Sequence, residues 1–363
     1  MKRSYTIYSK WFNELAHSQQ NYDQLFKLFH QILLQANGDV NEALNWMTSL
    51  NNRYNFTEDL GRFIQQLKDD GLIAERDQVY VLTSRGNQTI RKSSFNEIFS
   101  NLQKRGFGSH NTPFAGKGFE RLPETRPFSF GDTVDQIEPT RSLGNAIKRS
   151  GLDNFKLTED DLEVYETEHL ATCATVLLID ISHSMVLYGE DRITPAKNVA
   201  LALTEFIMQN YDKDSIHIIA FGDDASELQV SDLPYLSVGP YHTNTKAALQ
   251  LARQILNQKK HENKQIFMIT DGKPSCIWEG LKLYKNPYGL DRKIVNQTLR
   301  EAVMCRRQKI EITTFMVASD PYLQGFVKEL AEANQGRAYF TGLRNLGEYI
   351  FYDFVKNRKK TLR

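Results

Sequence analysis

The sequence predicts an α/β protein, in which a doubly wound, mainly parallel sheet follows a mostly helical N-terminal region. From about residue 171 onward, five short apolar runs alternate with amphipathic helical stripes. The runs are apolar on both faces, which is typical of parallel strands covered by helices on both sides. Before residue 105 the apolar spacing is helical, as in the stripe of Phe95, Ile98, Phe99 and Leu102.

Within residues 1–104, a helix is expected to end at Gly71, a short β-ribbon to cover 72–83, and a new helix to begin near Ser84. This order is similar to that of a winged helix, so a DNA-binding regulator is one alternative function. However, residues 1–104 hold 12 Lys and Arg against 11 Asp and Glu, and no basic surface is visible. We therefore expect a protein-docking or packing module that binds no nucleic acid.

Residues 105–170 change in character and are rich in glycine and proline. We expect an extended connector here, with a short helix over 140–150. The segment 157–168 then carries six acidic residues and no basic one, which is typical of a solvated face. The predicted organisation is thus an N-terminal region (1–104), a connector (105–170) and an α/β domain (171–363).

The α/β domain is defined by its strands and helices. The predicted strands cover 172–180, 215–222, 264–272, 310–319 and 336–342, and helical stripes fall at 196–207, 248–255 and 323–330. Thr194 and Pro195 are expected to be the N-cap and first residue of the first helix. In such sheets, ligands bind at the carboxyl ends of the strands. Asp180 and Asp271 each end a predicted strand, so two acids are expected at one edge.

Composition limits the functional classes. The 363 residues have a net charge of +1, so no overall field attracts nucleic acid or an anionic membrane. The three cysteines form no CxxC pair, which favours a reducing compartment. No apolar run approaches the ~20 residues that span a bilayer, and the start lacks the apolar core of a signal peptide. We expect a cytoplasmic protein that does not contact the membrane.

The polar residues that follow the first strand favour a metal site. Asp180, Ser182 and Ser184 alternate, so their side chains can face one way in extended backbone. A second loop offers Thr243 and Thr245, and Asp271 ends a further strand. These oxygen donors suit Mg²⁺, and Mn²⁺ is also accepted. Because only two protein charges face a dication, a partner's Asp or Glu would be favoured as a further ligand.

The same residues allow two catalytic alternatives. A phosphoryl-transfer aspartate needs a second acid two positions later, where this chain has Ser182. A Ser/His pair is disfavoured because His183 and its neighbouring serines diverge in extended backbone, and no G-x-S-x-G motif is present. We therefore predict no enzymatic activity and no catalytic residue. A metal-dependent phosphohydrolase stays the enzymatic alternative.

Four further residues have predicted positions. Asp320 is expected to be the N-cap of the helix that begins near Tyr322. Asp223 is expected in a turn after a strand. Lys273 and Ser275, just after Asp271, are expected at the rim of the site, where a partner would contact them.

The constellation Asp180-Ile-Ser182-His-Ser184, then Thr243, then Asp271 resembles the D-x-S-x-S…T…D metal-ion-dependent adhesion site of von Willebrand factor A domains. The resemblance covers about residues 171–363. It implies that Asp180, Ser182 and Ser184 hold the ion, that Thr243 joins in the liganded state, and that Asp271 binds directly or through water. Thr243 is chosen over its neighbour because the family uses the first Thr of its loop.

The whole chain is also similar to a narrower bacterial group. The segments PETRPFSFGDTVD, TEHL, KQIFMITDGKP and GEYIFYDFVKNRKK resemble the D subunit of magnesium chelatase and the CoxE-type partners of MoxR-class AAA+ ATPases. The resemblance implies a non-enzymatic subunit that couples an ATPase ring to a client protein. The expected partner is thus a MoxR-class ATPase, or its client, that supplies an acidic side chain to the metal.

Overall fold

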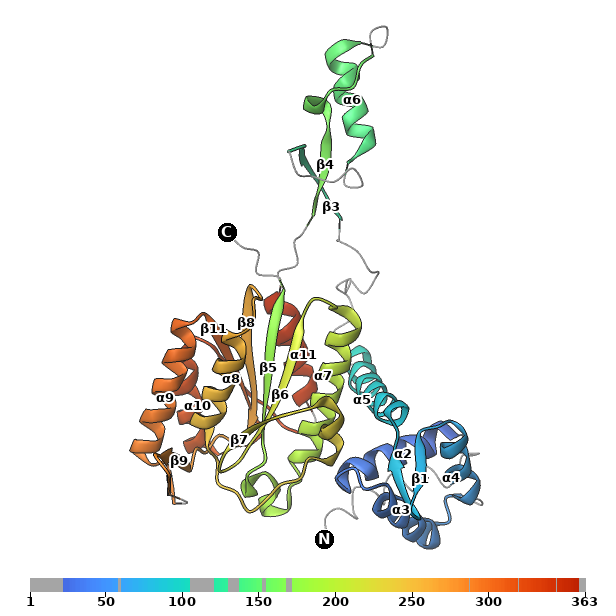
Figure 1. Cartoon of the computed structure of the whole chain (residues 1–363), viewed down its shortest axis with the longest axis vertical. Helices are drawn as coiled ribbons and strands as arrows, with labels where there is room; N and C mark the ends of the chain where they lie inside the picture. The colour runs from blue at the N-terminus through green and yellow to red at the C-terminus, as the bar shows by residue number, and fades with distance from the viewer. Residues whose placement is uncertain are drawn as a thin grey trace. The chain divides into compact units, whose positions relative to one another are not determined.

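The computed structural model describes residues 22–57, 60–104, 121–129, 137–151, 155–167, 172–286, 288–318, 320–343 and 345–358. The glycine cluster of the expected connector, at 105–120, lies outside these residues. The chain forms two compact units (Figure 1). The larger combines the N-terminal region with the C-terminal α/β domain, and the smaller lies between them in the sequence.

A six-stranded sheet forms the centre of the larger unit. Its order is β12 (Arg337–Phe340), β11 (Ile310–Met316), β8 (Asn263–Thr270), β5 (Cys173–Asp180), β6 (Ser215–Phe221) and β7 (Ala225–Leu228). The first five strands are parallel and β7 is antiparallel. The predicted fold class is confirmed, and the five predicted strands are the five parallel ones. The short edge strand β7 was not predicted because it has no apolar run.

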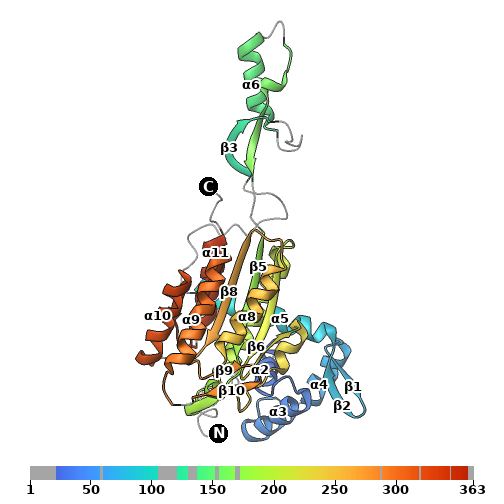
Figure 2. The ribbon, with the colours of Figure 1, turned by 60° about the vertical axis from the view of Figure 1, so that its left-hand side comes forward.

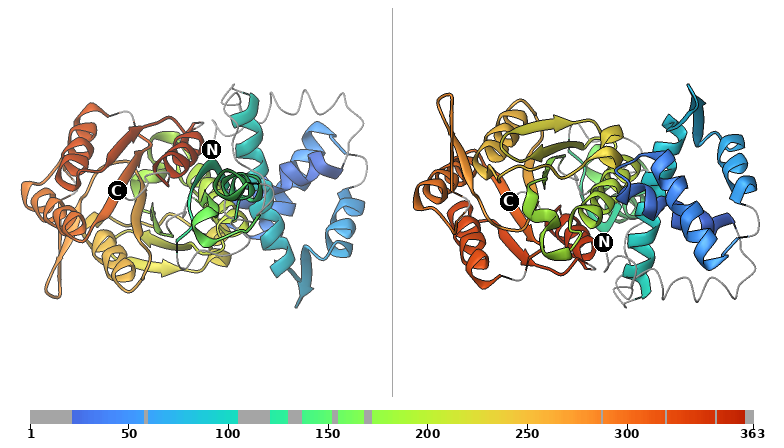
Figure 3. Two further views of the ribbon diagram at one scale, coloured as in Figure 1. Left: turned by 90° about the horizontal axis from the view of Figure 1, so that it is seen from above. Right: turned by 90° about the horizontal axis from the view of Figure 1, so that it is seen from below.

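Helices cover both faces of this sheet (Figures 2 and 3). The helices on one face are α7 (Ile193–Asn210) and α11 (Leu346–Arg358), and those on the other are α8 (Thr245–Asn257), α9 (Arg292–Arg307) and α10 (Pro321–Asn334). On the central strand β5, Leu177 and Ile179 belong to the core with α7, whereas Val176 and Leu178 belong to the core with α8. Every residue of β5 is buried, because alternate side chains enter two different cores.

The caps of two helices test the sequence predictions. Asp320 accepts a hydrogen bond from the backbone N–H of Tyr322 at 2.8 Å, which confirms it as the N-cap of α10. The prediction for α7 is wrong, because the helix begins at Ile193 and Thr194 lies inside its first turn. The Asp191 carboxylate accepts the free N–H of Thr194 at 3.0 Å instead.

The N-terminal region has the predicted order of helix, β-ribbon and helix. It consists of α2 (Tyr22–Gln35), α3 (Val40–Tyr54), α4 (Leu60–Asp69), the ribbon β1 (Ile73–Arg76) and β2 (Val79–Leu82), and α5 (Ser84–Lys104). Helix α5 packs along α7, where the Phe95 and Phe206 rings stack with centroids 6.0 Å apart. The Arg91 guanidinium also pairs with Glu205 at 3.1 Å. Phe95 and Ile98 of the apolar stripe predicted on α5 therefore pack against the α/β domain.

A buried lysine joins the N-terminal region to the α/β domain. Lys197 of α7 is 0% exposed. Its ammonium donates to the Leu34 carbonyl, to Asn37 Oδ1 at 3.1 Å and to the Leu236 carbonyl at 3.0 Å. Leu34 lies in the last turn of α2, where carbonyl groups lack helical partners. The Lys197 ammonium thus connects α7 to α2 and to Leu236, the residue that follows the 3₁₀ helix η4 (Val230–Tyr235).

The smaller unit pairs β3 (Arg121–Pro127) with β4 (Glu163–Thr167) and contains α6 (Pro139–Ser150) and the 3₁₀ turn η2 (Glu159–Asp161). Helix α6 confirms the short helix predicted at 140–150, whereas the strand pairing was not predicted. Within the acidic segment, Asp161 is 3% exposed and accepts two hydrogen bonds of 2.8 Å from Arg149. The expectation of a solvated face is wrong at this residue, because a distant guanidinium neutralises the buried carboxylate.

The helices give no sign of a membrane span. None in the described ranges is both long and apolar enough to cross a bilayer.

Candidate metal centre

The two predicted acids lie on neighbouring strands at one edge of the sheet. Asp180 is the last residue of β5, and Asp271 directly follows β8. The two strands are parallel partners, with Ile179 paired to Ile269. The carboxyl ends of the strands therefore bring together two acids that are 91 positions apart in the sequence.

Asp180 is fixed by hydrogen bonds to both of its carboxylate oxygens. The side chain is 0% exposed. Oδ1 accepts the backbone N–H of Ser182 at 2.9 Å, and Oδ2 accepts the Thr270 hydroxyl at 2.7 Å. Each carboxylate oxygen still has a free lone pair after these bonds. The carboxylate is thus oriented by its neighbours and can still bind a cation.

The electrostatic surroundings of the pair favour a cation. Burial, and next the negative charge of Asp271, raise the pKa of Asp180 to about 7. The guanidinium of Arg192 is 3.9 Å from Asp271 Oδ2 and also pairs with Glu190 at 3.0 Å. A divalent ion between the acids would remove both the desolvation penalty and the repulsion that disfavour ionised Asp180.

The two serines of the motif lie beside each other. The Ser182 and Ser184 hydroxyl oxygens are 3.0 Å apart, at the start of the 3₁₀ helix η3 (His183–Gly189). Two adjacent ligands of an octahedral Mg²⁺, at 2.0–2.1 Å from the ion, lie about 2.9 Å from each other. The spacing of the hydroxyls therefore fits neighbouring positions in such a coordination sphere.

Thr243 is positioned by a network of backbone hydrogen bonds. Its N–H donates to the Ser275 hydroxyl at 2.9 Å, and its carbonyl accepts the Ser275 N–H at 2.9 Å. On either side, the His242 N–H donates to Asp223 Oδ1 at 2.7 Å, and the Asn244 amide donates to the Asp223 carbonyl at 3.0 Å. Asp223 and Ser275 thus organise the loop that carries Thr243. The sequence had predicted only their positions, with Asp223 in a turn and Ser275 at the rim.

Two glycines set the path of this loop. The Tyr241 ring lies against Gly222 and Gly239, where an added Cβ would come within 2.7 Å and 2.1 Å of Tyr241 atoms. A side chain at either position would have to displace the Tyr241 ring. The two glycines therefore let Tyr241 pack directly against the backbone at this edge.

A hollow of about 300 Å³ opens at the serines and at the Thr243 loop. Its lining residues are Ser182, His183, Ser184, Pro240, Tyr241, His242, Thr243, Lys273 and Ser275. Lys273 and Ser275 thus lie at the rim, as predicted. Asp180 and Asp271, at 0% and 3% exposed, are not among the lining residues. The hydroxyl donors and a cationic rim face the opening, while the two negative charges are buried.

The donor set fits a hard divalent cation. The five predicted ligands, Asp180, Ser182, Ser184, Thr243 and Asp271, offer only oxygen atoms, which suits Mg²⁺ or Mn²⁺. Within the described residues, no three His, Cys, Asp or Glu side chains form a metal-binding group. Hydroxyl groups would therefore have to complete the coordination of the two acids.

Two residues that shape the site were missed by the sequence analysis. Thr270 bonds Asp180 and also accepts the Gly272 N–H at 3.1 Å. Thr270 is a polar residue at the end of an apolar strand, directly before Asp271, and this position could have indicated its role. Arg192 approaches Asp271 from another element, and no local pattern predicts that contact.

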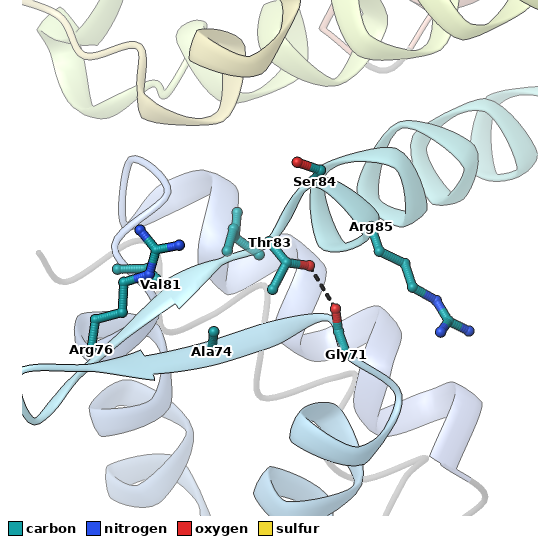
Figure 4. A pocket seen from close by; sticks show the side chains of 8 residues that line it. Gly71, Ala74, Arg76, Val81, Thr83, Ser84 and Arg85 are labelled. Carbon is teal, nitrogen blue, oxygen red and sulfur yellow. Dashed lines mark hydrogen bonds between the residues drawn. The ribbon is translucent and has the colours of Figure 1, made fainter.

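A second hollow, of about 500 Å³, lies in the N-terminal region (Figure 4). It is lined by Gly71, Ala74, Arg76, Val81, Leu82, Thr83, Ser84 and Arg85. Arg76 and Arg85 lie on opposite sides of it, and the Thr83 hydroxyl bonds the Gly71 carbonyl at 2.6 Å. No carboxylate lines this hollow, so it offers no alternative metal site.

Comparisons with known proteins agree with the fold. Residues 173–355 match the family described as "Rv0959-like protein, vWA domain", and residues 120–167 match "Rv0959-like protein, third domain". The uncharacterized proteins Rv0959 of Mycobacterium tuberculosis and Mb0984 of Mycobacterium bovis are each 30% identical over 294 residues, which is 78% of this chain. The chain spans 43% of the length of these relatives.

Solved structures that match part of the chain are more distant in sequence. The PilB minor pilin from Streptococcus sanguinis is 12% identical, with a TM-score of 0.46, over 54% of this chain and 64% of the pilin. BatB from Bacteroides thetaiotaomicron is 16% identical, with a TM-score of 0.40, over 52% of this chain and all of BatB. The match over 173–355 covers half of the chain and contains every residue of the candidate metal centre. The protein therefore belongs to the Rv0959-like family of von Willebrand factor A domain proteins.

Proposed function

We propose that this protein is a non-enzymatic, Mg²⁺-dependent protein-interaction subunit whose metal site binds an acidic side chain of a partner. The main support is the pair of buried acids, Asp180 and Asp271, at the ends of neighbouring strands, next in sequence to Ser182, Lys273 and Ser275, which line a hollow. An octahedral Mg²⁺ takes six oxygen ligands, and the chain offers five donor residues. An Asp or Glu from outside could therefore complete the coordination of the ion.

The surroundings of the serines support a binding role over an enzymatic one. The Ser182 and Ser184 hydroxyls bond to each other at 3.0 Å. An activated nucleophile would need its hydroxyl against a general base. Assays of phosphate-ester hydrolysis with Mg²⁺, on the wild type and Asp180→Asn, test the enzymatic alternative.

Titration calorimetry with Mg²⁺ and Mn²⁺, followed by Asp180→Ala, tests the metal site. We expect one bound ion per chain and no binding by the variant. Partner capture should then be lost both with EDTA and with Asp180→Ala. If a correctly folded chain captured its partner equally well under both conditions, the proposal would be wrong.

We further propose that the partner is a MoxR-class or chelatase-type AAA+ ATPase, or its client, and that the complex is cytoplasmic. The similarity of the sequence segments to that group supports the first part. The three cysteines, which are buried and free, support a reducing compartment. A pull-down with the full chain in Mg²⁺, analysed by mass spectrometry, should return an ATPase. Repeated failure to find one would contradict this part alone.

A further inference from the structure

A hairpin that projects from the metal edge has no role in holding the ion. It consists of β9 (Cys276–Glu279) and β10 (Lys282–Lys285), which pair antiparallel through a two-residue turn. It follows β8 by only five residues, so it leaves the sheet at the edge where Asp271 lies (Figure 2). The hairpin is therefore near enough to the metal centre to contact whatever binds there.

The base of the hairpin is bonded to the site itself. Ser275, which lines the hollow, bonds the Thr243 backbone and accepts the Asn286 N–H at 2.8 Å. The first strand adds a bond from the Cys276 N–H to the Thr243 carbonyl at 3.3 Å. Both ends of the hairpin are thus held at the loop that carries Thr243, which fixes their direction relative to the metal.

The hairpin exposes apolar side chains that a solvent-facing turn does not need. Leu281 at the turn is fully exposed, at 101%, and Trp278 is 40% exposed. Tyr288, just after the second strand, is 87% exposed. Tyr241 adds a 42% exposed ring at the hollow. The hairpin and its flanking residues thus expose several large apolar side chains on the segment that follows Asp271, as protein-binding sites often do.

The same segment is basic. Residues 272–293 hold five basic residues (Lys273, Lys282, Lys285, Arg292 and Lys293) and two acidic ones (Glu279 and Asp291), in a chain with a net charge of only +1. Both acids are already engaged, because Glu279 pairs with Lys293 at 2.7 Å and Asp291 caps α9. The surface is therefore complementary to an acidic segment.

The hairpin is short enough to belong to the same protein–protein interface as the metal centre. At about 3.3 Å per residue, the turn lies roughly 15–20 Å from Ser275. An interface of ordinary size buries about 800 Å² per partner, which corresponds to a patch about 30 Å across. One partner surface can thus contact the metal hollow and the hairpin together.

We propose that the hairpin is the second contact of the same acidic partner and binds a large apolar side chain about five residues along from the carboxylate that reaches the metal. This inference rests on the proposed function. It assigns specificity to Leu281 and Trp278, whereas the metal supplies an attraction common to any acidic segment.

Two fluorescent 12-residue peptides test the inference by anisotropy with the full chain in Mg²⁺. Both carry one Glu in a Gly/Ser background, and five residues later one has Leu and the other Ser. We expect the Leu peptide to bind about tenfold more tightly, because one apolar side chain is buried. The preference should fall to about one in Leu281→Ser. The preference should persist in the control variant Met208→Ser, which also replaces an exposed apolar side chain with serine. Met208 is 57% exposed and lies near the C-terminal end of α7, away from the hairpin.

The outcomes separate the two proposals. Equal binding of both peptides that still requires Mg²⁺ would overturn the hairpin inference and leave the metal proposal intact. Binding that ignores EDTA, or no binding of either peptide, would overturn both. Calorimetry should show unchanged Mg²⁺ affinity in Leu281→Ser. If sedimentation showed that the wild type is a dimer and Leu281→Ser a monomer, a second copy would occupy the hairpin and the inference would be wrong.

Discussion

At the scale of single residues, the buried acids of the proposed metal centre are expected to destabilise the fold when no cation is bound. Asp180 is fully buried and close enough to Asp271 for that charge to disfavour its ionisation. Structural needs alone would favour a neutral side chain at this position. The conflict is typical of functional sites, where local destabilisation is retained because a ligand offsets it.

Asp180→Asn should separate the destabilising effect of the buried charge from the stabilising effect of a bound ion. In EDTA at pH 8, we expect the variant to be more stable than the wild type, by about 1–2 kcal/mol, because a repulsive buried charge is removed. In saturating Mg²⁺ the order should reverse, since the variant cannot use the ion. Urea unfolding under both conditions measures the change. A variant less stable than the wild type even in EDTA would show that the carboxylate has a structural role that the amide cannot fill.

His30 should make folding sensitive to acid. Its ring is buried, with Nε2 3.1 Å from the Ser94 hydroxyl, and burial lowers its pKa from 6.5 to about 4. Between these values the unfolded chain binds a proton that the folded chain does not. Stability should therefore fall as the pH decreases from 6.5 to 4, by roughly 3 kcal/mol from this residue.

Urea unfolding across this pH range measures the effect. His30→Gln cannot titrate and should flatten the slope over pH 4–6.5. Ser94→Ala keeps the buried ring and should retain the slope, which makes it the matched control. If His30→Gln kept the full slope, other groups would be responsible for the loss of stability in acid.

At the scale of elements, the contact between the N-terminal region and the α/β domain depends on Lys197. Its ammonium serves acceptors from α2, from the loop after α2 and from the residue after η4. The neighbouring Gly38 has φ +79°, and an added Cβ would lie 2.6 Å from the Tyr235 ring of η4. The close approach of α2 and η4 thus requires both the lysine and the glycine.

Lys197→Met should lower the free energy of unfolding by about 2–4 kcal/mol, because buried carbonyl groups lose a charged donor. Lys92→Met, at an exposed position of α5, should change it by less than about 0.5 kcal/mol. Chemical denaturation gives the free energies, and hydrogen exchange should show faster opening of α2 in the Lys197 variant. A loss of stability with no change in α2 would place the effect elsewhere.

At the scale of the whole molecule, the ion is expected to stabilise the folded chain through linkage. A ligand that binds only the folded state adds about 2.7 kcal/mol at 100 times its Kd. The melting temperature of the wild type should therefore rise on adding Mg²⁺ and fall back with EDTA. Asp271→Asn should show almost no shift, and Asp223→Ala a reduced one, because Asp223 organises the Thr243 loop without being a predicted ligand. Equal shifts in all three chains would indicate that Mg²⁺ acts elsewhere.

The sequence by itself determined the five parallel strands and three of the helices that cover them, α7, α8 and α10, through the spacing of apolar runs and helical stripes. Polar residues at the ends of strands predicted Asp180, Ser182, Ser184 and Asp271 as oxygen donors, whereas the choice of Thr243 came from the resemblance to von Willebrand factor A domains. The same spacing predicted the helix–ribbon–helix order of the N-terminal region and the helix α6.

Only the tertiary structure decided which distant groups meet. No local pattern predicts that Arg149 neutralises Asp161, that Arg192 approaches Asp271, or that β3 pairs with β4. The β9–β10 hairpin has too few apolar residues to stand out as strands, yet backbone bonds to Ser275 hold it at the metal edge. The physical reason is the same throughout, because periodicity reports which face of an element is buried, whereas long-range ion pairs and hydrogen bonds depend on which elements the fold brings together.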